Sequence, residues 1–266
     1  MSKINAVRLI NVNYNNNAYR ISDETLHFNG ESTLISLQNG GGKSVLVQML
    51  TAPFVHPRYR NTKDRLFESY FTTNKPSFIL VEWALDQGAG YVLTGLMVRK
   101  SQDMEEDRKE NLDIIGIVSE YQSPCIQDIH HLPVVEKGKK EMILKNFNSC
   151  RQLFETYKKD RDMKFFYYDL TNYAQSRQYF NKLMEYQINY KEWETIIKKI
   201  NLKESGLSDL FADCKDEKGL TEKWFLEAIE SKLNKDKNRI KEFQSILEKY
   251  AGAEKALEVK KGMLLA

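Results

Sequence analysis

The stretch from residue 33 to residue 53 constrains the fold of this chain more than any other part of it. A short apolar run at 33–37 is followed by a glycine-rich loop at 38–44 and by a helical pattern that Pro53 stops. Proline lacks the N–H that a helix interior needs, so the helix is predicted to end by this residue. The order predicts a strand, a loop and a helix, which is a building unit of α/β folds.

The loop has the composition of a phosphate-binding loop. Its consecutive glycines allow main-chain N–H groups to curl around a phosphate without Cβ clashes, and the helix N-terminus adds its positive dipole. Lys43 would bridge the β- and γ-phosphates of a nucleoside triphosphate, and the hydroxyl of Ser44 would ligate Mg²⁺. We therefore predict a site for ATP and Mg²⁺ formed by Gln38, Asn39, Gly40, Gly41, Gly42, Lys43, Ser44 and Val45.

One position departs from the common form of this motif. The pattern G-x-x-x-x-G-K-[ST] has a glycine six residues before the lysine, and Leu37 stands there in this chain. Two alternatives to a working nucleotide site follow from the departure. The segment could be a glycine-rich turn with an incidental Lys-Ser pair, or a degenerate loop in a non-catalytic interaction module that works through its terminal helix.

Composition excludes several classes of protein. The 40 basic and 37 acidic residues leave a formal charge of +3, so any contact with DNA must come from a local patch. The three cysteines, Cys125, Cys150 and Cys214, lack the spacing of a zinc site or a disulfide framework. No secretory signal opens the chain, and no stretch approaches the ~20 apolar residues of a membrane span. We expect a cytoplasmic protein, with association with the nucleoid left open.

Most of the first 185 residues are predicted to form a sheet. The β-rich runs 77–85 and 90–98, separated by a turn-like segment, predict a hairpin, and the charged run 100–113 predicts a loop. Further strands are predicted at 4–11, 19–28, 114–118 and 165–170.

The last third predicts helices and the start of a coiled-coil arm. Asn189, followed by Glu192, can cap a helix that reaches residue 200. Beyond Thr221, apolar residues continue at heptad spacing to Leu264, which is longer than a globular helix usually is. Such a stripe needs a partner helix, expected in another chain or in a continuation of this one. The predicted domains are a nucleotide-binding lobe at 1–185, a helical neck at 186–220 and the start of the arm at 221–266.

The string Asn39-Gly40-x-Gly42-Lys43-Ser44, after an N-terminal sheet, resembles the N-G-x-G-K-S loop of SMC and ABC-type ATPase heads. The order of loop, hairpin and helical arm is similar to the N-terminal lobe of such a head. The stretch 206–225 looks like the neck of MukB-like and Wadjet-type SMC relatives. The resemblance covers the whole chain in layout, and only residues 39–44 are specific as a motif.

The resemblance implies an α/β P-loop lobe that acts with other parts. In SMC heads, two heads sandwich ATP, and each phosphate loop is completed by the L-S-G-G signature of the other head. That signature and an Asp-Glu strand are absent from this sequence. We therefore expect the front half of a head, which needs a C-terminal lobe of the same protein and a second head for hydrolysis. DNA is an implied partner, in chromosome segregation, repair or anti-plasmid defence.

A self-contained P-loop NTPase or kinase is the main alternative. In that case Asp169, at the end of the apolar run 165–168, would be the carboxylate on the Mg²⁺ side. Glu82 ends a similar run and is a weaker candidate for a catalytic base. The glutamine with which ABC-type heads sense Mg²⁺ would be Gln122, after the hairpin. Each of these residues can equally be an ordinary sheet or loop position.

Basic residues follow the loop helix at the distance where SMC heads carry an arginine loop. A phosphate or DNA contact from at least one of them is a hypothesis, and a solvated basic loop explains them as well. They are Arg58, Arg60, Lys63 and Arg65. A second basic stretch, Lys232 to Lys241, is better explained as the solvated face of a coiled coil. His130 and His131 have no further ligands at a regular spacing, so they do not predict a metal site.

Overall fold

The structure is a computed structural model, and it describes residues 2–14, 17–38, 41–61, 65–101, 111–137 and 142–201. The chain divides into two compact units, Met1–Leu202 and Lys203–Ala266, and all described residues belong to the first. The predicted arm at 221–266, and the predicted neck beyond residue 201, therefore lie outside the described residues.

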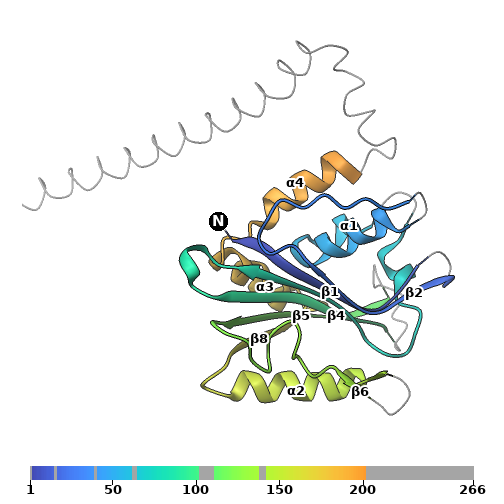
Figure 1. Cartoon of the computed structure of the whole chain (residues 1–266). Coiled ribbons are helices and arrows are strands. Elements are labelled where there is room, and N and C mark those ends of the chain that lie inside the picture. The colour runs from blue at the N-terminus through green and yellow to red at the C-terminus, as the bar shows by residue number, and fades with distance from the viewer. Residues whose placement is uncertain are drawn as a thin grey trace, which may run out of the picture. The chain divides into compact units, whose positions relative to one another are not determined.

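A six-stranded sheet forms the centre of the first unit, with the order β2-β1-β3-β4-β5-β8 (Figure 1). All neighbouring strands in this order are antiparallel. The strands are β1 (Lys3–Tyr14), β2 (Tyr19–His27), β3 (Ser77–Ala84), β4 (Tyr91–Lys100), β5 (Leu112–Tyr121) and β8 (Lys164–Asp169). The expected α/β class is confirmed, with a sheet that is antiparallel throughout its described strands.

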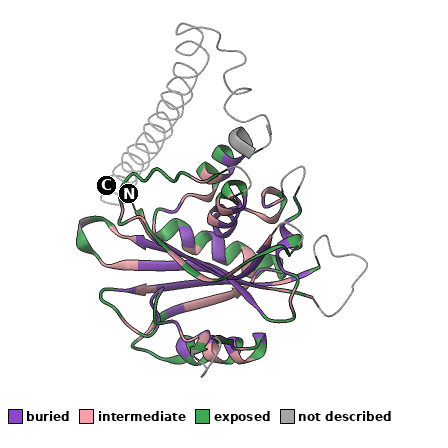
Figure 2. Cartoon of the chain, turned by 45° about the vertical axis from the view of Figure 1, so that its right-hand side comes forward, coloured by how far each residue is buried: buried purple, intermediate pink, exposed green. Residues whose placement is uncertain are grey.

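Both faces of the sheet are buried (Figure 2). Along β1, Val7 and Leu9 belong to the apolar cluster on one face, and Ala6 and Ile10 belong to the cluster on the other. This follows from the two-residue period of a strand, which sends successive side chains to opposite faces. The central strands are therefore apolar on both sides, as expected for a sheet with a layer on each face.

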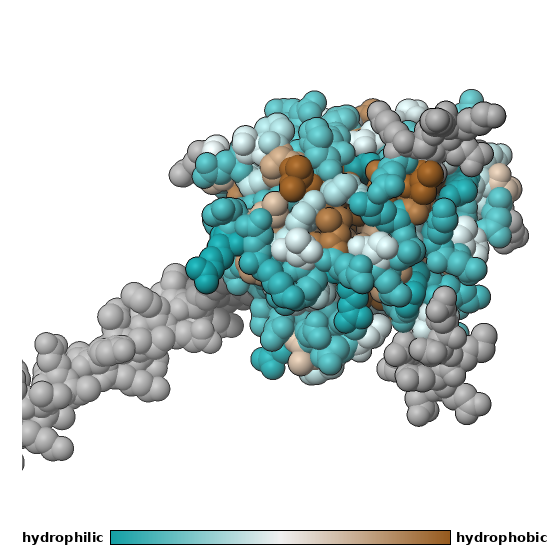
Figure 3. Space-filling model, turned by 90° about the horizontal axis from the view of Figure 1, so that it is seen from below, coloured by the Kyte–Doolittle hydropathy of each residue, from teal (hydrophilic) through white to brown (hydrophobic). Residues whose placement is uncertain are grey.

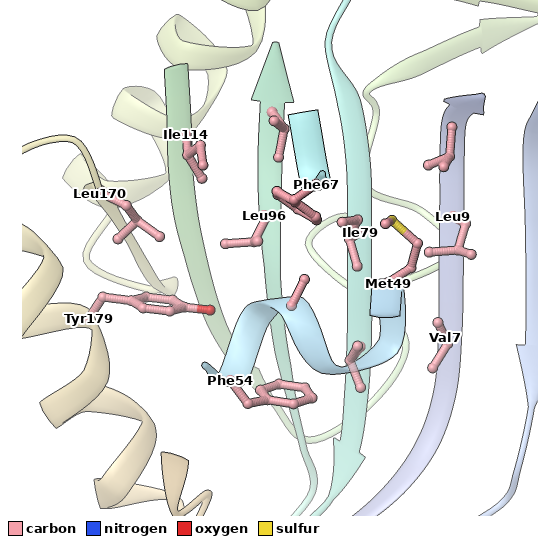
Figure 4. Packing of buried hydrophobic residues seen from close by; sticks show 14 of the residues in the cluster. Val7, Leu9, Met49, Phe54, Phe67, Ile79, Leu96, Ile114, Leu170 and Tyr179 are labelled. Carbon is pink, nitrogen blue, oxygen red and sulfur yellow. The ribbon is translucent and has the colours of Figure 1, made fainter. Parts of the chain in front are cut away.

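The first layer contains the loop helix. It consists of α1 (Lys43–Thr51), the short helices η1 (Ala52–Phe54), η2 (Pro57–Tyr59) and η3 (Phe67–Tyr70), and the helices α3 (Tyr173–Glu185) and α4 (Tyr190–Asn201). Figure 4 shows Met49 of α1 lying over Leu9 and Ile79 of the sheet. Gly116 makes room for α3, since a Cβ there would come within 2.7 Å of the Tyr179 ring.

The second layer covers the opposite face and is formed by α2 (Phe147–Lys159) and the small hairpin of β6 (Val135–Lys137) and β7 (Met142–Leu144). The buried side chains of α2 are Phe147, Cys150, Phe154 and Tyr157, a helical spacing that places them on one stripe. Asn146 caps this helix by accepting a hydrogen bond from the N–H of Ser149 at 2.8 Å. α2, β6 and β7 were not predicted from the sequence.

Most of the predicted elements are confirmed, and one is wrong. The hairpin forms as β3 and β4, and the helices that follow the loop and Asn189 form as α1 and α4. The expected strand at 33–37 is not a strand, and Leu34 within it is 96% exposed. A strand needs a neighbour for its hydrogen bonds, and no described strand pairs with this segment. Among the described helices, none combines the length and apolar character needed to cross a bilayer.

Candidate phosphate-binding loop

The described part of the loop requires glycine at two positions. At Gly41, a Cβ would lie 2.9 Å from the carbonyl oxygen of Gln38, closer than real Cβ atoms usually approach. Gly42 has φ of 86° and ψ of 16°, in the left-handed region that glycine adopts at little cost. Asn39 and Gly40 lie outside the described residues. The two glycines that can be seen are thus required by the backbone geometry.

The loop leads directly into the N-terminus of α1, which no side chain caps. The first turn of a helix has N–H groups without intrahelical partners, and α1 has no acidic residue there to balance the helix dipole. Val45 contributes only its main chain to this end, because its side chain is buried in the core. Lys43 and Ser44 are exposed at the same end. The described geometry therefore offers amides, an ammonium group and a hydroxyl to an anion.

Two details of the loop show how it is closed. The N–H of Gly41 donates to the carbonyl of Gln38 at 2.9 Å, so this amide takes part in a turn. The ammonium group of Lys43 donates to the carbonyl of Leu37 at 2.9 Å and thereby joins the two ends of the loop. Leu37 uses its main chain in this contact, and its side chain lines an apolar pocket. The departure from the usual glycine is therefore compatible with this closure.

An apolar pocket of about 220 Å³ lies beside the loop. The segment 32–38 forms one wall of it and runs as an extended chain above α1 in Figure 1. Ile35 and Leu37 from this segment face Leu9, Ile21 and Leu26 of the β1–β2 hairpin and Val45 and Leu46 of α1. Among the described residues, one side chain from outside the segment donates a hydrogen bond to the main chain of residues 32–37. It is the ammonium group of Lys43, which donates to the carbonyl of Leu37.

Gln48 of α1 fixes the basic segment that follows the loop helix, and it was not predicted. Its side chain is buried, and its amide nitrogen donates to the carbonyl of Arg60 at 2.7 Å. Its amide oxygen accepts from the Tyr70 hydroxyl at 2.7 Å. Burial raises the pKa of Tyr70, with Arg65 acting in the opposite direction, so the hydroxyl keeps its proton. A polar residue on the inner face of a helix was the signal available in the sequence.

The structure separates the four basic candidates. Arg58 and Arg65 are exposed, whereas Arg60 is 2% exposed and its Nε donates to the carbonyl of Ala52 at 3.1 Å. The guanidinium of Arg60 also lies over the ring of Phe67. Lys63 lies outside the described residues. The burial of Arg60 does not support its predicted phosphate contact, and the hypothesis rests on Arg58 and Arg65.

Asp169 is not brought to the loop. The strand register aligns it with Ile115, Met97, Phe78 and Ile10, across four strand spacings. At ~4.8 Å for each spacing, this carboxylate lies roughly 19 Å across the sheet from β1, over which α1 packs. Its oxygen accepts from the N–H and hydroxyl of Thr171, at 3.0 and 2.6 Å, so it orders the turn before α3. This position does not support a magnesium role beside Ser44.

Glu82 is buried and shares a face of the sheet with Leu80, opposite α1 and on the side that α2 covers. Its carboxylate accepts hydrogen bonds from Asn5, at 2.6 Å, and from the hydroxyl of Tyr121. Burial, followed by the charge of Glu82, raises the pKa of Tyr121. Glu82 therefore belongs to an internal hydrogen-bonded group, and the face on which it lies does not support a catalytic role at the loop.

Gln122 and the histidine pair lie away from the loop helix. Gln122 follows β5 next to Gly90, at the end of the sheet where Lys3 pairs with Ala84. Tyr14, which contacts Gly42, lies at the other end of β1, eleven residues after Lys3. At ~3.3 Å per residue, these two ends of the strand are roughly 36 Å apart. The magnesium role suggested for Gln122 is not supported by this distance.

His131 instead donates from Nδ1 to the buried carboxylate of Asp128, at 2.8 Å. Among the described residues, no group of three or more His, Cys, Asp or Glu side chains could hold a metal ion. Of the residues predicted to ligate a metal, Ser44 is the one that lies in the first turn of α1. No protein-family model matches this chain, and no curated protein sequence matches it.

Proposed function

We propose that this chain is the ATP-binding N-terminal lobe of an SMC-like ATPase head that acts on DNA in the cytoplasm. In this proposal Lys43 and the first-turn amides of α1 hold the triphosphate, and Ser44 ligates Mg²⁺. Hydrolysis requires a C-terminal lobe of the same protein and a second head, because the in-line water needs a positioned base. The DNA process, whether segregation, repair or defence, is not specified by the site.

The observation that carries the proposal is the junction between loop and helix. Gly41 and Gly42 are required by close approach and by a positive φ, and α1 begins at the next residue, Lys43, without a side-chain cap. An uncapped helix N-terminus with an adjacent lysine is an arrangement that favours phosphate. Lys43 and Ser44 are exposed there, so a ligand can reach both side chains.

The exposed segment 32–38 supports the need for a second lobe. Leu34 is 96% exposed and Ile35 is 40% exposed, although their sequence favours a strand. The adjacent pocket beside Ile35 and Leu37 is apolar. A strand supplied by a C-terminal lobe would satisfy the main chain of this segment and cover its apolar side chains. The wrong prediction of a strand at 33–37 is thus explained if its sheet partner belongs to the other lobe.

Nucleotide binding by the whole chain tests the proposal. Titration calorimetry with Mg²⁺-ATP should give saturable binding by the wild-type protein, and Lys43→Ala should weaken it by at least about tenfold, or ~1.4 kcal/mol. Lys158→Ala removes a lysine far from the loop and should leave the affinity unchanged. Ser44→Ala should remove the difference between titrations with Mg²⁺ and with EDTA. Wild-type protein that binds no nucleotide would refute the proposal.

Turnover separates the lobe from a self-contained NTPase. The chain alone should hydrolyse ATP little, and addition of a C-terminal lobe in trans should raise the rate. Asp169→Asn should leave any turnover unaffected, because Asp169 lies roughly four strand spacings from β1, about 19 Å. Turnover by the isolated wild-type chain that Asp169→Asn abolishes would favour the self-contained enzyme instead.

A further inference from the structure

The segment 32–36 runs extended along the surface, and no described strand pairs with it (Figure 1). Its side chains alternate, since Ile35 and the following Leu37 line the apolar pocket whereas Leu34 is 96% exposed. This alternation is the two-residue period of a β-strand. Among the described residues, no main-chain hydrogen bond joins 32–36 to another part of the main chain. The segment therefore has the form of a strand and lacks a strand's neighbour.

The composition of this segment differs from that of an ordinary surface loop. Residues 32–37 include no Gly, Pro, Asn or Asp, which are the usual loop formers, and no charged side chain. Two of them, Thr33 and Ile35, are β-branched and favour a strand. A short neutral run with strand composition and without Pro or Gly is the kind that pairs with an identical copy of itself.

Other exposed apolar side chains are of a different kind. The face that α2 covers is mainly hydrophilic, with small and separate apolar spots (Figure 3). Single exposed apolar residues are normal on protein surfaces. Leu66, which is 54% exposed, precedes η3, and its carbonyl accepts from the N–H of Ser69 at 3.1 Å. Leu66 is thus an exposed leucine in a turn of its own chain, and it serves as a control for Leu34.

The segment is complementary to itself when two copies run antiparallel about Leu34. In this register Leu34 lies opposite the same residue of the second copy. Ser32 lies opposite Ser36, and Thr33 lies opposite Ile35. Opposed side chains on neighbouring strands have Cβ atoms ~5 Å apart, so the two exposed leucines would cover each other. The register places no like charges opposite each other, because the segment has none.

Contacts within the chain set the ends of this pairing. On one side, the carbonyl of Leu37 accepts from the ammonium group of Lys43 at 2.9 Å. On the other side, the N–H of Glu31 donates to the carbonyl of Phe28 at 2.9 Å. The five residues between these contacts are left for a second strand. Their odd number places Leu34 on the two-fold axis of a symmetric pair.

We propose that 32–36 pairs with the same segment of a second copy of this chain, as an antiparallel ribbon centred on Leu34. In the proposed head a C-terminal lobe covers this segment, so the second copy takes that place when the lobe is not bound. The pairing goes beyond the proposed function and needs no nucleotide, because it uses no group in the first turn of α1. Five paired residues make a small interface, so the dimer should be weak and should dissociate on dilution.

Sedimentation of the whole chain tests the association. The apolar stripe predicted beyond Thr221 is a second route by which two copies join, so the variants are compared in a Leu247→Lys background. Leu247→Lys alone should pass from one chain to two as its concentration rises from roughly 1 to 100 µM. Adding Leu34→Lys places two ammonium groups opposite each other and should weaken the association at least about tenfold. Adding Leu66→Lys should leave it unchanged.

Nucleotide binding separates this proposal from the proposed function. Leu34→Lys should bind Mg²⁺-ATP as the wild type does, because its side chain points away from the loop pocket and is exposed. Loss of association with ATP binding intact is therefore the expected result for this variant. Equal association of the Leu34→Lys and Leu66→Lys proteins, or a single chain at every concentration in the Leu247→Lys background, would overturn the proposal.

Cross-linking and hydrogen exchange test the register. Leu34→Cys places two thiols opposite each other, where Cα atoms ~4.5–5.5 Å apart allow a disulfide. Oxidised glutathione should link two chains through position 34, as peptide mass mapping would show, and Leu66→Cys should give no more linkage than the native cysteines do. The amides of 32–36 should exchange more slowly at high than at low protein concentration. Equal linkage at both positions, or exchange that does not depend on concentration, would overturn the pairing.

Discussion

The ammonium group of Lys43 donates a hydrogen bond to the carbonyl oxygen of Leu37, 2.9 Å away. These residues stand at the lysine and at the first glycine position of the usual phosphate-loop pattern. The contact uses the main chain of Leu37, which every residue type can provide. The bulk of the leucine side chain is directed to the apolar pocket beside the loop.

This relationship predicts the effect of restoring the usual glycine. Leu37→Gly keeps the carbonyl that Lys43 contacts, so ATP affinity should stay within about threefold of wild type, or ~0.6 kcal/mol. The loss of an apolar side chain from a partly exposed pocket should lower the free energy of unfolding by ~1 kcal/mol. Calorimetry and urea unfolding measure the two effects. A large gain in ATP affinity would show that the leucine obstructs the site.

Gly42 and Gly88 form a matched pair for testing the loop. Both have positive φ, 86° and 70°, and a Cβ at either meets nothing closer than 3.6 Å. Alanine at each should cost ~1–2 kcal/mol in the free energy of unfolding, because the left-handed region is unfavourable for it. Only Gly42→Ala should weaken ATP binding. Equal nucleotide affinity in both variants would show that ligand binding does not need the left-handed conformation of Gly42.

Gln48 predicts a link between the loop helix and the basic segment. Gln48→Leu leaves the Tyr70 hydroxyl and the carbonyl of Arg60 without their buried partner, which should cost about 1–3 kcal/mol. Trypsin should then cleave after Arg58 or Arg65 faster than in the wild type, at a temperature where both proteins are folded. Tyr70→Phe is the control, because it removes only one of the hydrogen bonds and should cost ~1 kcal/mol. Unchanged cleavage of Gln48→Leu would contradict the link.

Asp128 predicts how stability depends on acid. Burial opposes its charged form, but hydrogen bonds from His131 and from the N–H groups of Cys125 and His130 outweigh burial and lower the pKa of Asp128. A carboxylate whose pKa is lower in the folded than in the unfolded state stabilises the fold above the unfolded value, about 3.9, and this contribution is lost as the pH falls through the folded value.

Asp128→Asn should therefore reduce the loss of stability below about pH 4 and should destabilise the protein by about 1–3 kcal/mol at pH 7. Urea unfolding at a series of pH values measures both effects. Asp162→Asn controls for the removal of one negative charge at an exposed position. Parallel pH profiles for the wild type and Asp128→Asn would contradict the assignment.

Local pattern was enough to predict the elements whose partners lie close in the chain. The hairpin of β3 and β4 and the helix after Asn189 could be read from the sequence, because alternation and capping are local signals. The stripe of Phe147, Cys150, Phe154 and Tyr157 was also present in the sequence and would have predicted α2.

Features that depend on tertiary contacts could not be predicted in this way. The run 33–37 has strand composition, but whether it pairs depends on a strand from elsewhere. The burial of Arg60 follows from its contacts with Ala52 and Phe67, and no sequence motif indicates these contacts. The register that separates Asp169 from the loop is likewise set by strand order. The need for glycine at Gly41 and Gly42 could be predicted because it lies in consecutive residues, and phosphate binding by the loop stays a prediction.

The strand order also has a consequence for synthesis of the protein. Three of its pairings, β1 with β2, β3 with β4 and β4 with β5, join strands that follow one another directly in the chain. Short loops close early, so these pairs can assemble while the ribosome is still adding later residues. A strand that arrives afterwards to cover 32–38 would meet a surface that is already folded. In the proposed head, an N-terminal lobe and a C-terminal lobe that are expressed separately should therefore still be able to assemble.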